Sequence, residues 1–235
     1  MITVSDGKYQ YHFCNDTGIE TKRAKAMFSK EPGTIKWISS FEPNSVFYDV
    51  GANVGVYTLY GCKRVKQVYA FEPHLGNCMN LIKNVKLNKA DNVKVMSVAL
   101  HNKVGFFNFD YRSDVTASSA SQLDSNPQFE PIGTEYKFAV TIDDLQQTLR
   151  PPDYVKIDVD GNEILILHGM KEALTQKRIK SLQVELGSNK DEAARFLANY
   201  GYKIESEHYT ARGEQKLKAG EDPNSIVHNV IFLPT

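Results

Sequence analysis

A glycine-containing turn after an apolar segment is the first place in this sequence where chemistry is expected. Phe47–Val50 is apolar apart from Asp49, and the residues that follow include Gly51, Asn53 and Gly55. In an open α/β sheet, ligands bind where the strands end, and glycines let the backbone approach them. The spacing differs from the Gly-x-Gly-x-x-Gly of dinucleotide sites, and the Asp49 carboxylate would repel phosphate but attract a sulfonium or an amino group. A tight turn in which Asp49 caps the next helix is the competing interpretation.

A second acidic residue ends the next apolar segment. Glu72 and Pro73 follow Gln67–Phe71 and lie about twenty residues beyond Gly51. A carboxylate at this position of a Rossmann-like fold accepts hydrogen bonds from ribose hydroxyls. Glu72 is therefore the predicted ribose-binding residue, although a carboxylate that caps the following helix would give the same pattern.

The elements that must position these residues alternate between strand-length and helix-length segments from Ser45 onward. Such alternation predicts a parallel sheet with helices on both faces. Tyr202–His208 and Ser225–Leu233 are joined by a turn-rich stretch without a predicted helix, so we expect an antiparallel hairpin that makes the doubly wound α/β sheet mixed. The predicted strands are Val46–Val50, Gln67–Phe71, Val93–Leu100, Tyr154–Val159 and Ser181–Leu186, and the predicted helices are Val56–Val65, His74–Asn88, Glu163–Leu174 and Asp191–Tyr200.

Residues 1–44 form a predicted N-terminal cap that precedes a domain of residues 45–235. Ile2–Cys14 alternates around an Asp-Gly turn, which predicts a hairpin. Glu20–Ser29 and a second segment after a Glu-Pro-Gly break predict two short helices.

One long segment does not fit the alternation. Val104–Tyr111 predicts an additional strand, and the Ser-rich segment Ser113–Gly133 predicts no regular structure. A stretch of about twenty structureless residues inside a compact domain is either an active-site lid or disordered, and the sequence leaves both interpretations open.

Five blocks of the sequence carry a family resemblance. In order they are FYDVGANVGVYT (Phe47–Thr58), VYAFEP (Val68–Pro73), NVKVMSVAL (Asn92–Leu100), VTIDDL (Val140–Leu145) and YVKIDVDGNEILILHGM (Tyr154–Met170). Together they resemble the FkbM family of S-adenosylmethionine-dependent methyltransferases, and DVGAN and KIDVDG are the most specific parts. The resemblance implies a class I methyltransferase (Rossmann-like) fold with a seven-stranded sheet whose last strand is antiparallel. It also implies that S-adenosyl-L-methionine methylates a hydroxyl of a glycan or secondary metabolite and leaves as S-adenosyl-L-homocysteine.

The resemblance also implies which residues hold the cofactor. Asp49, Gly51, Asn53 and Gly55 would surround its methionine end, Glu72 with Pro73 would hold the ribose, and Ala99 and Leu100 would line the adenine. Two positions depart from the family pattern. His101 and Asn102 follow the adenine wall where Ser-Asp is usual, which leaves His101 without an assigned role, and Asp160 replaces the usual glutamate.

Carboxylates at the ends of the last parallel strands are the catalytic candidates. Methyl transfer to oxygen requires the hydroxyl proton to leave, and a positioned carboxylate can accept it. Strand periodicity places Asp158 on the same side as Lys156, with Asp160 just beyond in the turn. Asp158 is the first candidate, as the base or as the residue that orients the acceptor and the sulfonium. Asp160 and Glu185 are its partners.

These three carboxylates could also hold a divalent metal, which would lower the pKa of the acceptor hydroxyl. No histidine-rich spacing supports a metal, and Asp160 and Glu163 equally suit the N-terminus of the following helix. A metal is therefore not favoured.

Composition limits the partners. Lys and Arg total 28 and Asp and Glu total 28, so a net charge of zero argues against a nucleic-acid acceptor. The three cysteines form no CxxC pair, and neither a signal peptide nor an apolar run long enough to span a membrane is recognised. We expect a cytoplasmic protein with a small-molecule or glycan acceptor. A homodimer is expected only if Trp37 and Phe41 are exposed, and their burial against the sheet is the simpler expectation.

Two other functions fit the same architecture. A nicotinamide-dependent oxidoreductase would use the same ribose carboxylate, but the absent Gly-x-Gly-x-x-Gly and the presence of Asp49 disfavour it. A S-adenosylmethionine-binding module without catalysis would keep every cofactor residue, and the sequence leaves it open.

Overall fold

A seven-stranded sheet forms the centre of the molecule. The computed structural model describes residues 1–119, 121–124 and 130–235. The strand order is β12-β13-β11-β10-β3-β4-β5, and β13 runs antiparallel to both of its neighbours while the other pairs are parallel. The predicted mixed sheet with an antiparallel last strand is confirmed. The strands are β3 (Val46–Val50), β4 (Gln67–Phe71), β5 (Val93–Met96), β10 (Tyr154–Ile157), β11 (Ser181–Leu186), β12 (Tyr202–His208) and β13 (His228–Pro234).

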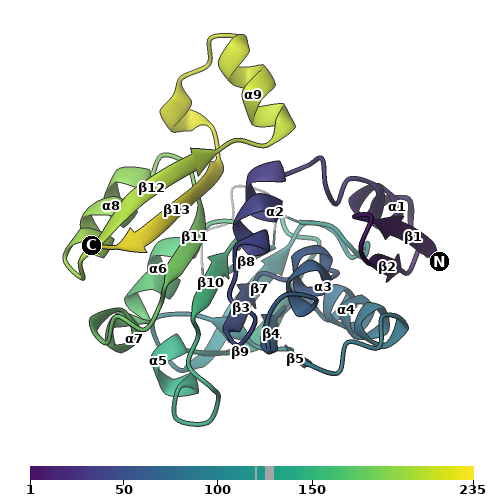
Figure 1. Cartoon of the computed structure of the whole chain (residues 1–235), viewed down its shortest axis with the longest axis horizontal. Coiled ribbons are helices and arrows are strands. Elements are labelled where there is room, and N and C mark those ends of the chain that lie inside the picture. The colour runs from purple at the N-terminus through teal and green to yellow at the C-terminus, as the bar shows by residue number, and fades with distance from the viewer. Residues whose placement is uncertain (120, 125–129) are drawn as a thin grey trace.

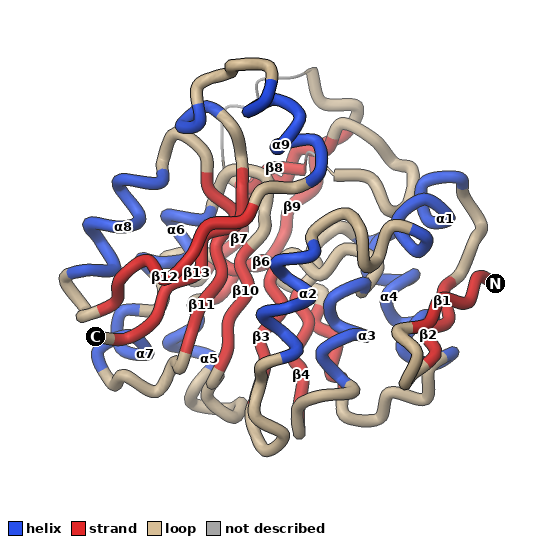
Figure 2. Tube along the Cα trace, turned by 45° about the horizontal axis from the view of Figure 1, so that its top comes forward, coloured by secondary structure: helices blue, strands red, loops and turns tan. Residues whose placement is uncertain are grey.

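Helices cover both faces of this sheet (Figures 1 and 2). Alternate side chains of β3 explain the two layers, because Tyr48 packs into one hydrophobic core and Phe47 into the other. The Phe47 core lies under α2 (Pro32–Ser39), α3 (Val56–Cys62) and α4 (Leu75–Leu87), and the Tyr48 core under α5 (Ile142–Leu145), α6 (Glu163–His168), α7 (Lys171–Thr175) and α8 (Lys190–Ala198).

A second sheet of four strands corrects two predictions. Its order is β6-β9-β7-β8, formed by β6 (Ala99–Leu100), β9 (Gly133–Val140), β7 (Gly105–Tyr111) and β8 (Ser121–Leu123). The single predicted strand Val93–Leu100 is wrong, because β6 leaves the central sheet and pairs with β9. The predicted structureless segment Ser113–Gly133 contains β8 and the first residue of β9. Residues 120 and 125–129 of that segment lie outside the described residues, so the choice between lid and disorder stays untested there.

The N-terminal elements lie on the Phe47 side of the sheet, where the first hairpin is hydrogen-bonded to α4. β1 (Ile2–Ser5) and β2 (Gln10–Phe13) form the predicted hairpin, and α1 (Gly18–Lys25) follows. Helix α1 begins earlier than predicted because Thr17 and Glu20 form a capping box. Trp37 and Phe41 are buried, and the Phe41 ring stacks on Tyr154 with their centroids 3.8 Å apart, so the expected burial against the sheet is confirmed.

Two further helix predictions are wrong. The predicted helix Glu163–Leu174 is divided into α6 and α7 by Gly169, where an added Cβ would overlap the carbonyl oxygen of His101. The stretch between β12 and β13, predicted to lack a helix, contains α9 (Ala211–Lys218) and a short 3₁₀ turn, Pro223–Ser225. Helix α9 projects beyond the sheet in Figure 1, and it begins where the Thr210 hydroxyl accepts a hydrogen bond from the Gly213 N–H.

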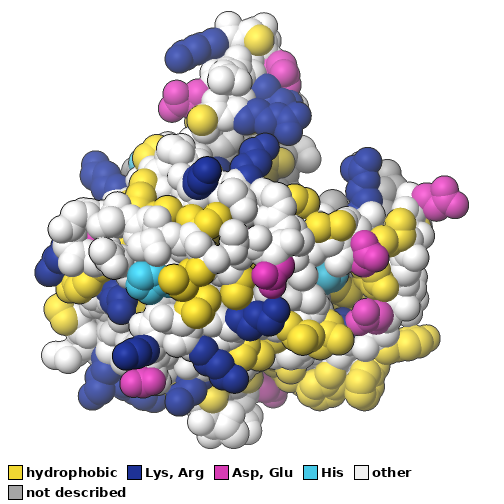
Figure 3. All heavy atoms as spheres, turned by 90° about the vertical axis from the view of Figure 1, so that its right-hand side faces the viewer, with side chains coloured by type: hydrophobic (Ala, Val, Ile, Leu, Met, Phe, Trp, Pro, Cys, Tyr) yellow, Lys and Arg dark blue, Asp and Glu magenta, His cyan; other side chains and the backbone are white. Residues whose placement is uncertain are grey.

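Charged side chains of both signs are interspersed on the face shown in Figure 3, as expected for a chain without net charge. No helix among the described residues is long and apolar enough to cross a membrane.

Candidate functional site

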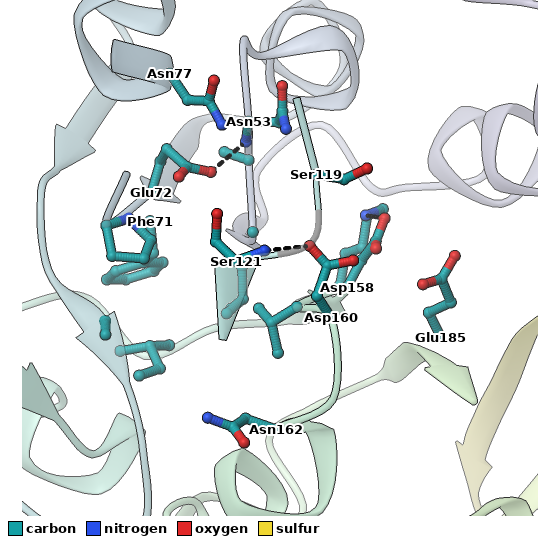
Figure 4. A pocket seen from close by; sticks show the side chains of 18 of the residues that line it. Asn53, Phe71, Glu72, Asn77, Ser119, Ser121, Asp158, Asp160, Asn162 and Glu185 are labelled. Atoms are coloured by element: carbon teal, nitrogen blue, oxygen red, sulfur yellow. Dashed lines mark hydrogen bonds and ion pairs between the residues drawn. The ribbon is translucent and has the colours of Figure 1, made fainter. Parts of the chain in front are cut away.

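A cavity of about 330 Å³ opens at the carboxyl ends of β3, β4, β10 and β11. This is where an open α/β sheet binds its ligands, and the volume lies in the range of small-molecule sites. Figure 4 shows Asn53, Phe71 and Glu72 at one end of the cavity and Asp158, Asp160 and Glu185 at the other. The cavity lining thus joins the residues of the separate sequence motifs.

The turn after β3 is fixed between two neighbouring strands. The N–H groups of Gly51 and Ala52 both donate to the carbonyl oxygen of Phe71, each at 3.0 Å. Gly51 has a φ of 78°, and an added Cβ would overlap the carbonyl oxygen of Asp158. Only glycine meets both requirements, so the turn brings the backbone of residues 51–53 to the cavity wall.

Of the four turn residues predicted to surround the methionine end of a cofactor, two line the cavity and two do not. Gly51 and Asn53 line the cavity, whereas Asp49 and Gly55 do not. Asp49 is buried behind the turn, where Thr58 Oγ1 donates to Asp49 Oδ2 at 2.5 Å. Burial raises the pKa of Asp49. Asp49 therefore stabilises the turn from the side away from the cavity and does not face the cavity.

Glu72 faces the cavity from the end of β4. Its Oε2 accepts a hydrogen bond from the Asn53 N–H at 2.7 Å, and its Oε1 accepts one from the His74 N–H at 2.8 Å. Burial raises the pKa of Glu72 to about 7, against the lowering effect of these two N–H groups. Each oxygen keeps a lone pair for a further donor, which fits the predicted contact with ribose hydroxyls. The neighbouring Pro73 also lines the cavity.

An apolar wall lies beside Glu72. Phe71, Ala99 and Leu100 line the cavity there, and Leu123 of β8 lies on the same lining. Ala99 and Leu100 reach it from the four-stranded sheet rather than from an extension of β5. This wall suits an apolar or aromatic ligand group.

Three carboxyl groups gather near the opposite end of the cavity, and two of them, Asp158 and Glu185, line it. Asp158, Glu185 and Glu31 each place an oxygen within 4.8 Å of the other two. Lys156, paired with Asp49 and Gln183 across the parallel strands, places its Nζ 2.6 Å from Asp158 Oδ2. The predicted neighbours Lys156, Asp158 and Glu185 are thus close together.

Glu31 is the member of this cluster that the sequence did not reveal. It lies at the N-terminus of α2 and is buried, and it accepts hydrogen bonds from Thr34 Oγ1 and Asn229 Nδ2, both at 3.1 Å. In the sequence it appears only as part of a helix-breaking Glu-Pro-Gly triplet. Nothing local connects residue 31 to a site more than a hundred residues away along the chain.

The charges of the cluster set its protonation state. Burial alone would raise the pKa of Asp158, but the Lys156 and Lys30 ammonium groups outweigh it and lower that pKa. The Asp158 carboxylate, together with burial, raises the pKa of Glu185 well above its ordinary value. At neutral pH, Asp158 is therefore ionised and Glu185 carries a proton that it donates towards Asp158.

Asp160 lies apart from this cluster. It is exposed, has a φ of 25°, and its Oδ2 accepts a hydrogen bond from the Ser121 N–H at 3.3 Å (Figure 4). Its carbonyl oxygen accepts a bond from Gln122 Nε2 at 3.0 Å. Asp160 thus connects the turn after β10 to β8 at the cavity rim. His101, which had no assigned role, does not line the cavity and packs against Phe107.

Among the described residues, the carboxyl groups that could share a metal are Glu31, Asp158 and Glu185, so Glu31 takes the part that was predicted for Asp160. Glu31 and Asp158 already pair with the ammonium groups of Lys30 and Lys156, each at 2.6 Å. Two cations in the cluster oppose the binding of a third, so the donor set does not fit a divalent metal well.

Comparisons with known proteins agree with this geometry. The family model for the methyltransferase FkbM domain matches residues 49–204. The hexuronic acid methyltransferase AglP of Haloferax volcanii is 24% identical over 159 residues, which are 67% of this chain and 63% of that protein.

Solved structures show the same fold. A methyltransferase FkbM from Methylobacillus flagellatus KT superposes with a TM-score of 0.56 at 15% identity, over 82% of this chain and 44% of that one. The precorrin-6y C5,15-methyltransferase of Geobacter metallireducens GS-15 superposes with a TM-score of 0.51 at 13% identity, over 98% of this chain and 97% of its own. A Streptococcus mutans protein in complex with SAH superposes with a TM-score of 0.51 at 10% identity, over 87% and 97% of the two chains. The chain thus spans less than two thirds of the length of AglP and of the Methylobacillus protein.

Proposed function

The chain belongs to the FkbM methyltransferase family, and we propose that it transfers a methyl group from S-adenosylmethionine to a hydroxyl oxygen of a glycan-type acceptor. The observation that carries this proposal is the cavity that joins the Glu72 carboxylate to the Asp158–Glu185 carboxyl pair. The family membership favours this function over the nicotinamide-dependent oxidoreductase that the architecture alone allowed.

The residues near β4 fit the adenosine part of the cofactor. Glu72 lines the cavity and is held by two backbone N–H groups, and each of its oxygens can accept a further hydrogen bond from a ribose hydroxyl. Phe71, Ala99 and Leu100 supply the apolar wall for adenine. When bound, S-adenosylmethionine supplies an electrophilic methyl group on a sulfonium.

Asp158 orients the acceptor in this proposal. Lys156 keeps its carboxylate ionised, so that it accepts the hydrogen bond of the acceptor hydroxyl and takes up the proton when the new carbon–oxygen bond has formed. Because its pKa is lowered, Asp158 is a weak base before that step. Most of the rate is therefore expected from alignment of the hydroxyl rather than from early proton removal.

Glu185 supports Asp158 from β11. As a protonated carboxyl it donates a hydrogen bond to Asp158, and it holds that carboxylate in one orientation. The pair thus shares one proton across the acceptor end of the cavity.

The choice of a sugar as the acceptor rests on the side chains that line the cavity and on one relative. The acceptor end of the cavity carries the carboxyl groups of Asp158 and Glu185 and the ammonium groups of Lys30 and Lys156, and such polar groups suit a polyhydroxylated molecule. AglP is named for its action on a hexuronic acid. We therefore favour a sugar acceptor over a polyketide or lipid.

The test is a methyl-transfer assay with S-adenosylmethionine and a panel of neutral sugar glycosides and their uronic acid counterparts. We expect release of S-adenosylhomocysteine and a product that carries one additional methyl group. An alkali-stable product identifies a methyl ether, whereas an alkali-labile one identifies an ester and excludes the hydroxyl as acceptor atom. Binding of the cofactor without turnover on any acceptor would instead favour a non-catalytic module.

A further inference from the structure

Three cationic side chains line the cavity, and two of them are already paired. Lys156 pairs with Asp158 and Lys30 with Glu31, each across 2.6 Å. Arg23 of α1, by contrast, forms no ion pair with any residue in the part of the chain that the structure describes. A cation that lines a cavity without a paired anion favours the binding of an anionic ligand group.

The guanidinium of Arg23 is held in place from one side. Its Nε donates a hydrogen bond to the carbonyl oxygen of Ala117 at 2.5 Å. Ala117 is itself fixed, because it is fully buried and its N–H donates to Asn77 Oδ1 at 2.7 Å. The next carbonyl oxygen, of Ser118, accepts a bond from Asn53 Nδ2 at 2.8 Å, so this segment is joined to the β3 turn.

The remaining donors of Arg23 have no acceptor within residues 1–119, 121–124 and 130–235. Glu72, the carboxylate whose pKa Arg23 lowers, is satisfied by the N–H groups of Asn53 and His74 and forms no bond to Arg23. A guanidinium with both terminal nitrogens available presents a planar pair of donors, which matches a carboxylate in bidentate geometry.

We propose that Arg23 binds the carboxylate of a ligand in this cavity. The inference rests on the proposed function, which offers two sources of that group: the amino-acid end of S-adenosylmethionine and the carboxylate of an acidic sugar. Both present the same planar anion. Arg23 lies outside the residues 49–204 that match the family, so the N-terminal cap would contribute a ligand contact that the family match does not include.

The cofactor source is tested by calorimetry on the full chain. S-adenosylhomocysteine is compared with its decarboxylated analogue, which keeps the adenosine, the thioether and the amino group. If Arg23 binds the cofactor carboxylate, Arg23→Gln lowers the affinity for S-adenosylhomocysteine roughly ten- to hundredfold and leaves the affinity for the analogue unchanged. Arg23→Lys, which keeps the charge but not the planar pair of donors, restores part of the loss.

The acceptor source is tested by kinetics with a uronic acid glycoside and its neutral counterpart. If Arg23 binds the acceptor, Arg23→Gln raises KM for the uronic acid roughly tenfold or more and leaves KM for the neutral sugar and the affinity for S-adenosylhomocysteine unchanged. Arg178→Gln is the matched control, since Arg178 is exposed and lies before β11 at the opposite sheet edge. This substitution changes neither the KM for the two sugars nor the affinity for S-adenosylhomocysteine.

Two outcomes overturn the inference while the proposed function stands. In the first, Arg23→Gln leaves both the cofactor carboxylate and the uronic acid bound as in the wild type. In the second, it lowers the affinities for S-adenosylhomocysteine and for the decarboxylated analogue equally, which identifies Arg23 as a structural residue that holds Ala117. Failure of the wild type to bind S-adenosylhomocysteine at all would overturn the proposed function, and this inference with it.

Discussion

The Lys156 ammonium lies 2.6 Å from the Asp158 carboxylate, on a side chain that is only 1% exposed. Burial alone would lower the pKa of Lys156, but the carboxylates of Asp158, Asp49 and Glu31 outweigh it and raise that pKa. Lys156 is therefore the counter-charge around which the acceptor end of the cavity is organised. Removal of one partner from such a buried pair leaves an uncompensated charge.

Lys156→Met is therefore expected to lower the free energy of unfolding by about 3–5 kcal/mol. Urea denaturation followed by circular dichroism measures the change. Lys94→Met, an exposed strand substitution in β5, is the matched control and should change stability by no more than about 0.5 kcal/mol. Equal effects of the two substitutions would show that Lys156 does not balance the carboxylates.

Asp158→Asn is expected to reduce kcat by roughly a hundredfold, because the amide can neither accept the hydroxyl proton nor keep the pair with Lys156. The affinity for S-adenosylhomocysteine should stay within a few-fold of the wild type, since Glu72 and the apolar wall are unchanged. Steady-state kinetics and calorimetry on the same preparation separate the two quantities. The exposed Asp91→Asn serves as control, and a loss of affinity equal to the loss of rate would contradict the assigned role.

Gly51→Ala is expected to be far more destabilising than Gly7→Ala. Both glycines have positive φ, 78° and 87°, so each substitution carries a similar conformational cost of roughly 1–2 kcal/mol. Gly7 has open space around it, whereas a Cβ on Gly51 would overlap the backbone of Asp158. The difference between the melting temperatures of the two variants measures the cost of the overlap between the β3 turn and the backbone that follows β10. Equal melting temperatures would argue against this close approach.

The raised pKa of Glu72 predicts a stability that falls with rising pH. In the folded protein the pKa is about 7, against 4.5 for an ordinary glutamate, so the folded state keeps a proton that the unfolded chain releases. This contribution is fully present below pH 4.5 and is lost as the pH rises through about 7. Glu163, whose pKa burial also raises to about 7, acts in the same window.

Urea unfolding of the ligand-free protein at pH 5 and pH 8 checks this expectation, with both pH values chosen at roughly the ends of the titration. Glu72→Gln should remove part of the decrease, and the double variant with Glu163→Gln a larger part of it. The raised pKa of Glu185 leaves a decrease in the double variant as well. A decrease that is as large in Glu72→Gln as in the wild type would place the Glu72 pKa near its ordinary value.

The sequence was sufficient for most strands of the central sheet and for its antiparallel last strand, because these strands are local apolar runs with clear ends. Val46–Val50, Gln67–Phe71 and Ser181–Leu186 have the predicted bounds, and the antiparallel return of β13 follows from two adjacent strands at the end of the chain. Asp158 and Glu185 could be placed together for the same reason, since the ends of neighbouring parallel strands share one edge.

The remaining parts depend on contacts between distant segments. β6 leaves the central sheet because it pairs with β9, which lies far along the chain. The local sequence around Ala99 does not predict that pairing. Asp49 looked accessible at the end of its strand, but the Thr58 hydroxyl shows that it points behind the turn. Arg23 reaches the cavity, and Glu31 reaches the Asp158–Glu185 pair, only through the packing of the N-terminal elements.

The most direct test of the cofactor assignment is calorimetric titration of the purified protein with S-adenosylmethionine and S-adenosylhomocysteine, with NAD as the competing ligand. The measurement is repeated on Glu72→Ala and on Glu192→Ala, an exposed position in α8 that serves as control. We expect both adenosyl ligands to bind to the wild type and to the control, and to lose at least roughly tenfold in affinity in Glu72→Ala. Absence of binding to the wild type, or tighter binding of NAD, would contradict the assignment of this cavity as a methyl-donor site.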